Sequence, residues 1–177
     1  AYTNHPQKDP DYWVASGNPL IIFIKCASIV PAYYYHFVKS WPHQPISRRK
    51  AYIIRGLLGF AWIYLLTYLV YHIFGWQILL YCWWGPALVA TAFFAFAFNW
   101  LPHHPHTHQE AYRNTRVLDY PGLQWILLGQ NYHLIHHLHP GLPFYTYPRA
   151  YNILKEDLLL QGTLILSESR LAPLKDL

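Results

Sequence analysis

The sequence predicts an all-α integral membrane bundle with a transmembrane hairpin, an interfacial helix and a cytoplasmic, His-rich helical cap. Of its 177 residues, 54% are hydrophobic and only 12% are charged, whereas an ordinary soluble domain carries about 25% charged residues. Eight Trp and sixteen Tyr suit the two interfaces of a bilayer. Twelve histidines gather mainly in the second half of the chain. The length fits a single domain over residues 1–177.

The opening of the chain predicts a polar loop followed by a helix at the membrane surface. Residues 1–18 are polar and rich in turn-forming residues. Residues 19–38 are mostly apolar but include Lys25, Pro31 and three consecutive tyrosines. If the polar opening is cytoplasmic, this segment lies in the interface or re-enters the membrane rather than spanning it. We expect an interfacial helix.

Two long apolar runs predict the transmembrane hairpin. Residues 56–74 are long enough to cross about 30 Å of hydrocarbon at about 1.5 Å per residue. Residues 77–98 form the second run, in which Gly85 and Pro86 are tolerated as a kink. Only two residues, Gly75 and Trp76, separate the runs. The sequence therefore predicts a tight turn between two spans.

Basic residues predict the orientation of this hairpin. The segment 39–55 contains five Lys and Arg residues and no acidic residue, so the positive-inside rule predicts a cytoplasmic loop. The hairpin then returns the chain to that side, and residues from 101 onward form the cap. Residues 151–161 show a partly amphipathic helical pattern suited to packing beneath the membrane domain. The net charge of +5 thus indicates the orientation of the chain in the membrane rather than binding to nucleic acid. The sequence shows no helix pattern typical of nucleic-acid recognition.

The segment 129–145 contains the densest group of histidines. His133, His136 and His137 have the spacing i, i+3 and i+4, which places them on one face of a helix. Neutral imidazole is a ligand for iron, zinc, copper or nickel. The alternative is that these are polar residues at an interface, but HxxHH beside a second histidine patch favours a metal site. His139 is a candidate for a supporting role next to the ligands.

The second patch follows the second apolar run. Asn99 and His103 lie four residues apart and would share a side if the helix persists, although Pro102 weakens that geometry. His103 is the better candidate ligand because it lies nearest the second apolar run. Three further histidines fit no single helical period and are expected in a loop: His104, His106 and His108.

The ligand types favour iron over zinc. Structural zinc sites usually combine Cys and His, and the sequence has no CxxC pair. With eight acidic residues in all, a Glu-rich soluble di-iron bundle is excluded. Carboxylates commonly orient a ligating histidine through its other ring nitrogen. The candidates for that role, for which ordinary loop polarity is the equal alternative, are Asp9, Asp11, Glu110 and Asp119.

Four motifs in this order resemble the membrane fatty acid desaturase superfamily: TNHPQKDPDYW near the start, NWLPH at 99–103, YRNTR at 112–116 and GQNYHLIHHLHPGLPFYTY at 129–147. Within it, the nearest resemblance is to bacterial β-carotene hydroxylases. Members hold two irons with three histidine boxes on the cytoplasmic face of the membrane. The resemblance implies that His133, His136 and His137 form the third box. It also implies that Asn99 and His103 match an additional NxxxH position, in which Asn99 would be a weaker or water-mediated ligand.

The resemblance implies an O2-dependent oxidation of C–H bonds in a long apolar substrate. A ferredoxin-like protein or a cytochrome would supply electrons, and the location would be the bacterial inner membrane. Ring hydroxylation of β-carotene towards zeaxanthin is the favoured reaction, and desaturation of fatty acyl chains is the alternative. A degenerate or metal-carrying membrane protein is a third possibility, but a transporter should place ligands within its spans. Within the two runs, His72 is the single histidine.

The start of the chain departs from the family pattern. In the family, the segment resembling TNHPQKDPD directly follows the second box, whereas this sequence begins at Ala1 and contains no Met. We therefore expect the C-terminal part of a longer domain, with five expected histidines missing. On that expectation the native protein is an enzyme and this chain alone is inactive.

Overall fold

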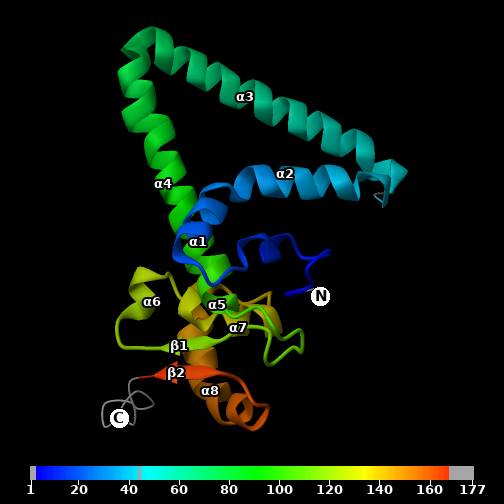
Figure 1. The fold of residues 1–177 in the computed structure, drawn as a ribbon, viewed down its shortest axis with the longest axis vertical. Coiled ribbons are helices and arrows are strands. Elements are labelled where there is room, and N and C mark those ends of the chain that lie inside the picture. The colour runs from blue at the N-terminus through cyan, green and yellow to red at the C-terminus, as the bar shows by residue number, and fades with distance from the viewer. Residues whose placement is uncertain (1–2, 44, 168–177) are drawn as a thin grey trace.

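A computed structural model describes residues 3–43 and 45–167, which are mostly helical with one small sheet (Figure 1). The longer helices are α1 (Pro19–Ala27), α2 (Ile29–Ser40), α3 (Ile46–Ile78), α4 (Gly85–Phe94) and α8 (Tyr147–Leu160). The short helical segments are η1 (Pro10–Val14), η2 (Trp41–His43), η3 (Leu79–Trp84), η4 (Ala95–Trp100), α5 (Leu101–His103), α6 (Leu123–Ile126), η5 (Gln130–Tyr132), α7 (His133–Leu138) and η6 (Phe144–Thr146). The strands are β1 (Val117–Asp119) and β2 (Ile165–Ser167).

The long apolar helices turn back on themselves at Gly75. Within the described ranges, one helical run is long and apolar enough to cross a bilayer, from Ser47 to His103. Gly75 interrupts it with φ 83° and ψ 174°, and Figure 1 shows α3 rising to a bend from which α4 returns. The break lies where the sequence predicts the turn between two spans. A transmembrane hairpin remains a prediction for this bent run.

The backbone angles of Gly75 make a specific prediction. Gly75→Ala places a Cβ in a conformation almost confined to glycine, at a cost on the order of 1–3 kcal/mol. We expect a lower thermal unfolding temperature of the detergent-solubilised protein. Gly59→Ala is the matched control, because Gly59 lies inside α3 with open space around its Cα. An equal loss of stability in both variants would contradict this explanation of the bend.

The predicted basic loop at 39–55 is wrong in its local structure. Helix α2 extends to Ser40 and α3 begins at Ile46, so Arg48 and Lys50 lie in the first turns of α3. Lys and Arg are good helix formers, and Pro45 directly precedes the helix. Up to the break at Gly75, residues 46–74 of α3 form a helix about 43 Å long, which exceeds about 30 Å of hydrocarbon. The basic turns can therefore lie outside an apolar layer that covers the rest of α3.

Residues 19–38, predicted as one interfacial helix, form two helices. α1 and α2 meet at an angle of 65°, with Ser28 between them. Together they are apolar enough for a broken span or a re-entrant loop, and the interfacial location remains a prediction. Lys25 donates from Nζ to the carbonyl of Ala15 at 2.8 Å. Helix α1 packs against α4 and η4 through a core that includes Ile22, Cys26 and Ala95.

The residues after 116 build a compact cap at the end of α5 (Figure 1). β1 pairs in parallel with β2, a sheet that the all-α prediction missed because strands of three residues carry no readable periodicity. The amphipathic helix expected at 151–161 is present as α8, which starts earlier, at Tyr147. The cap has its own core: Val117, Tyr132, Leu134, Ile135, Tyr147, Tyr151, Leu158 and Ile165.

Candidate metal centre

Three histidines from two distant segments meet at the junction between the apolar helices and the cap. One ring nitrogen from each of His103, His133 and His137 lies within 4.8 Å of the other two. Their ring centroids are 5.1 Å apart for His103–His133 and for His103–His137, and 4.7 Å apart for His133–His137. Three imidazoles at this spacing provide a group of nitrogen donors suited to a first-row transition metal.

The short helix α7 presents its histidines because its other face is anchored. Leu134 and Ile135 are completely buried in the core of the cap. The positions before and after this pair, His133, His136 and His137, therefore face the helical run from Ser47 to His103. α5 carries His103 on this opposite side, where the side chain is buried. The spacing predicted from the sequence thus produces a shared face once the neighbouring apolar residues are packed.

A glycine before this helix controls its approach. Gly129 has φ 76°, and a Cβ there would lie 2.7 Å from the carbonyl oxygen of Phe144. Gly129→Ala therefore forces the backbone before α7 away from η6, and we expect a loss of about 1–3 kcal/mol in the free energy of unfolding. Chemical denaturation would measure it. Gly141→Ala is the control, because nothing lies within 4 Å of a Cβ at that position; comparable losses would contradict the clash.

His136 lies beside the group of three but outside it. Its ring centroid is 5.5 Å from that of His133 and 5.8 Å from that of His137. Its Nδ1 is hydrogen-bonded with the hydroxyl of Tyr147 at 3.0 Å. The three histidines of the HxxHH motif are thus neighbours, and two of them share the group with His103.

Each of these four imidazoles has an oxygen partner at Nδ1. The partner of His103 is Oδ1 of Asn4 at 3.2 Å, and the partner of His133 is Oε1 of Gln130 at 2.7 Å. Tyr147 contacts His136 as described, and the hydroxyl of Thr3 lies 3.5 Å from His137. Such partners orient a ligating ring and leave its Nε2 for the metal. The partners are neutral side chains from three different segments.

Burial keeps His133 and His137 neutral. Burial, together with the adjacent His136, lowers the pKa of His137 from 6.5 to about 4. Burial and the neighbouring imidazoles lower the pKa of His133 well below its usual value. A neutral imidazole has the lone pair that a metal needs, and no proton must be displaced at neutral pH. Both the chemistry and the protonation of the group fit a bound iron.

The predicted orienting residues contact other groups. Asp9 accepts a hydrogen bond from the backbone N–H of Asn4 at 2.6 Å, and the side chain of Asn4 in turn contacts His103. Asp119 accepts from Tyr151 and Lys155, both at 2.8 Å. Asp11 accepts a hydrogen bond from the hydroxyl of Tyr33. Glu110 lies 3.6 Å from His108, and His139 is exposed. In the described residues none of the five touches an imidazole of the group.

The side chain of Asn99 contacts a residue outside the group. Its Nδ2 donates to the hydroxyl of Tyr33 at 3.1 Å. Asn99 belongs to the π-helical segment η4, whereas His103 ends α5. Because a π-turn is wider than an α-turn, positions i and i+4 no longer superpose across this junction. The expected shared side of Asn99 and His103 depends on regular α-helix that is absent here.

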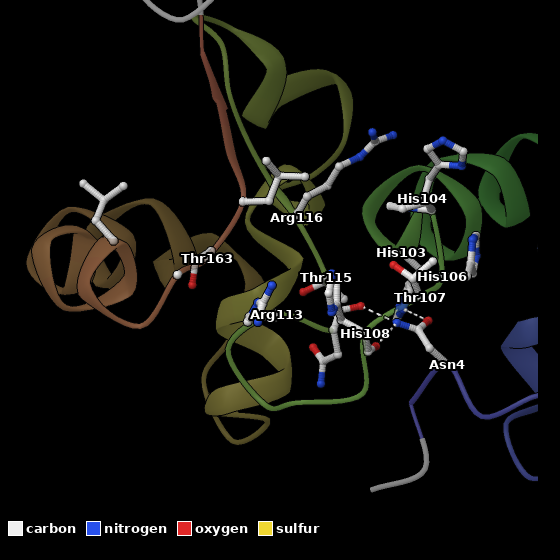
Figure 2. A pocket seen from close by; sticks show the side chains of 15 residues that line it. Asn4, His103, His104, His106, Thr107, His108, Arg113, Thr115, Arg116 and Thr163 are labelled. Carbon is white, nitrogen blue, oxygen red and sulfur yellow. Dashed lines mark hydrogen bonds between the residues drawn. The ribbon is translucent and has the colours of Figure 1, made fainter.

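The loop after His103 lines one side of an open pocket of about 430 Å3 (Figure 2). His106 is buried beside it, 6.1 Å from His103 between ring centroids, and its Nε2 has no partner among the described residues. Burial, followed by repulsion from His104, Arg116 and Lys25, lowers the pKa of His106 to about 4. His104 and His108 also line the pocket, as loop residues, in agreement with the prediction.

The residues missed from the sequence are the oxygen partners, above all Asn4 and Tyr147. Asn4 lies within the motif TNHPQKDPDYW, and Tyr147 lies at the end of the longest motif. Both residues lie in motifs that carry the resemblance to the family, but neither has a sequence spacing that relates it to a particular histidine. Their contacts arise from tertiary packing.

Comparison with known families agrees with this geometry. The family described as fatty acid desaturase matches residues 1–168. Comparisons with curated proteins and with solved structures gave no match. With a match over nearly the whole sequence, the chain belongs to the fatty acid desaturase family, whose members are membrane-bound di-iron oxidoreductases.

Proposed function

We propose that this protein is an O2-dependent di-iron enzyme that desaturates the acyl chains of membrane lipids. The observation that carries the proposal is the group of His103, His133 and His137 at the end of a long apolar helical run. The family supports acyl desaturation over ring hydroxylation of β-carotene. Bound iron would supply O2 activation and C–H oxidation, with electrons from a ferredoxin-like or cytochrome donor.

The residues of this chain would hold and orient the metal. His103, His133 and His137 would bind through the nitrogens that their oxygen partners leave free. His136 lies close enough to join them or to serve a second ion. Asn99, which contacts Tyr33, would act through a water molecule or only after a local rearrangement. Burial on the cap side limits access of bulk water to the ligands.

An apolar cavity supports a lipid substrate. It has a volume of about 750 Å3 and lies between α1 and α4. Its lining is almost entirely apolar and includes Phe23, Leu88 and Phe93. It also includes Trp100 and His104, and His104 directly follows the ligand His103. An acyl chain entering from the bilayer would therefore approach the metal centre along α4.

The basic residues support a cytoplasmic location for the site. Arg48 and Lys50 lie at the start of α3, and His103 lies at the far end of the run that returns from the bend (Figure 1). Both therefore lie away from the bend. With the positive-inside rule, the histidines would face the cytoplasm from the inner membrane.

Product analysis tests the proposal. The gene in its natural form is expressed in two hosts, one with saturated and monounsaturated lipids and one that accumulates β-carotene. We expect new double bonds in the acyl chains, detected by mass spectrometry after cleavage of the lipids, and unchanged carotenoids. Zeaxanthin with an unchanged acyl profile would replace the proposal by ring hydroxylation. If neither product forms when the cells are supplied with iron, the proposal is rejected.

A further inference from the structure

Asn4 is the most connected buried side chain near the metal centre. It is 3% exposed, and Figure 2 shows it beneath the loop that follows His103. Its Nδ2 donates to the carbonyl of His108 at 2.7 Å and to that of Asn114 at 2.6 Å. Its Oδ1 lies 3.2 Å from Nδ1 of His103. One amide thus joins the start of the chain, the histidine loop and a ligand of the proposed metal.

The two carbonyl contacts determine the orientation of the amide. An amide nitrogen has two hydrogens to donate and its oxygen only accepts. If the group were rotated, Oδ1 would lie against the carbonyl oxygens of His108 and Asn114, and three acceptors would repel one another. The nitrogen therefore faces these carbonyls, and the oxygen faces His103.

This orientation determines the tautomer of His103. Since Oδ1 of Asn4 can only accept, Nδ1 of His103 carries the hydrogen and donates it. A neutral imidazole has one N–H, so its Nε2 keeps the lone pair. We propose that Asn4 is a positioning residue that holds His103 as the Nδ1–H tautomer with Nε2 ready for the metal. The inference rests on the proposed metal centre for its function.

The backbone around Asn4 favours this residue type. Asn4 has φ 61°, a left-handed conformation that Asn and Asp tolerate better than most residues. Its backbone N–H donates to Asp9 at 2.6 Å, which keeps the turn closed. The backbone hydrogen bond and the two side-chain hydrogen bonds of Asn4 therefore fix its amide group, so the oxygen that faces His103 has little freedom to move.

Two substitutions separate the acceptor from the rest of the side chain. Asn4→Asp keeps an acceptor for His103 and tolerates the same backbone conformation, but it replaces the two donors by a second oxygen, which the carbonyls of His108 and Asn114 repel. Asn4→Gly keeps the backbone conformation and removes every side-chain contact. The control is Thr163→Val, which removes a buried hydroxyl that donates to the carbonyl of Tyr112 at 2.8 Å and touches no imidazole.

The first measurement needs no metal. 15N NMR of histidine-labelled, metal-free protein distinguishes Nδ1–H from Nε2–H, and the His103 signals are assigned with His103→Gln. We expect Nδ1–H in the parent protein, in Asn4→Asp and in Thr163→Val, and a shift towards Nε2–H in Asn4→Gly. Nε2–H at His103 in the parent protein, or an unchanged tautomer in Asn4→Gly, would overturn the proposal.

The second measurement titrates Co2+ as the probe by its visible absorption. We expect a loss of about 10–100-fold in affinity for Asn4→Gly, the usual effect of removing a partner of a ligating histidine. Asn4→Asp should retain most of the affinity, and Thr163→Val all of it. Equal losses in Asn4→Gly and Thr163→Val would reduce Asn4 to a structural role. If the parent protein binds no Co2+, the metal centre fails while the tautomer measurement still decides the role of Asn4.

Discussion

Replacing His133 by alanine is expected to abolish tight metal binding. His133 lies close to both other members of the group, with ring centroids 5.1 Å from His103 and 4.7 Å from His137. Its removal leaves two imidazoles, so the affinity for Fe2+ or Co2+ should fall by more than about 100-fold, beyond the usual effect of losing an outer partner. Metal analysis after gel filtration and Co2+ titration would measure the loss, and desaturation should disappear with it.

The control for this prediction is His139→Ala. His139 belongs to the same histidine-rich segment, but its side chain is exposed and lies outside the group. We expect its metal content and lipid products to equal those of the parent protein. A similar loss in both variants would show that the segment as a whole, rather than the group of three, binds the metal.

Acidification is expected to destabilise the metal-free protein between pH 6.5 and about 4. Burial lowers the pKa of His106 and of His137 to about 4 from an ordinary value of 6.5. The pKa of His133 is also lowered by burial. In this window the unfolded chain binds protons at these histidines and the folded protein does not. The free energy of unfolding therefore falls as the pH falls, which thermal unfolding in detergent would show.

A substitution at His106 isolates one part of this pH dependence. His106→Asn suits the left-handed φ of 65° at that position and removes one buried imidazole outside the group of three. We expect the slope of unfolding free energy against pH to decrease by at most about 1.4 kcal/mol per pH unit. His139→Asn is the exposed control. A slope unchanged by His106→Asn would show that this histidine is already protonated in the folded protein.

The local features of the fold were largely predictable from the sequence. The HxxHH spacing predicted a helix with His133 and His137 on one face, and apolar Leu134 and Ile135 on the other side stabilise that face. The bend at Gly75 followed from a glycine between two apolar runs. These features depend on residues within a few positions of one another, where periodicity and backbone preference are readable.

The features that depend on distant contacts were not predictable. Asp9 and Asp119 were among four candidate carboxylate partners of the histidines, with ordinary loop polarity as the equal alternative. The structure pairs the rings with neutral oxygens such as those of Asn4 and Gln130. The strands β1 and β2 pair residues nearly fifty positions apart. In each case the energy comes from packing and hydrogen bonds between segments that the sequence does not relate.

The sequence by itself therefore determined the membrane character of this protein, the residue type of its candidate metal ligands and the helix that carries two of them. Apolar length, histidine type and helical spacing are properties of the chain. Only the tertiary structure decided that His103 joins His133 and His137 while Asn99 turns to Tyr33. It also decided that Asn4 sets the tautomer proposed for His103. Hydrogen bonds to buried groups require complementary positions in space, and folding alone supplies these positions.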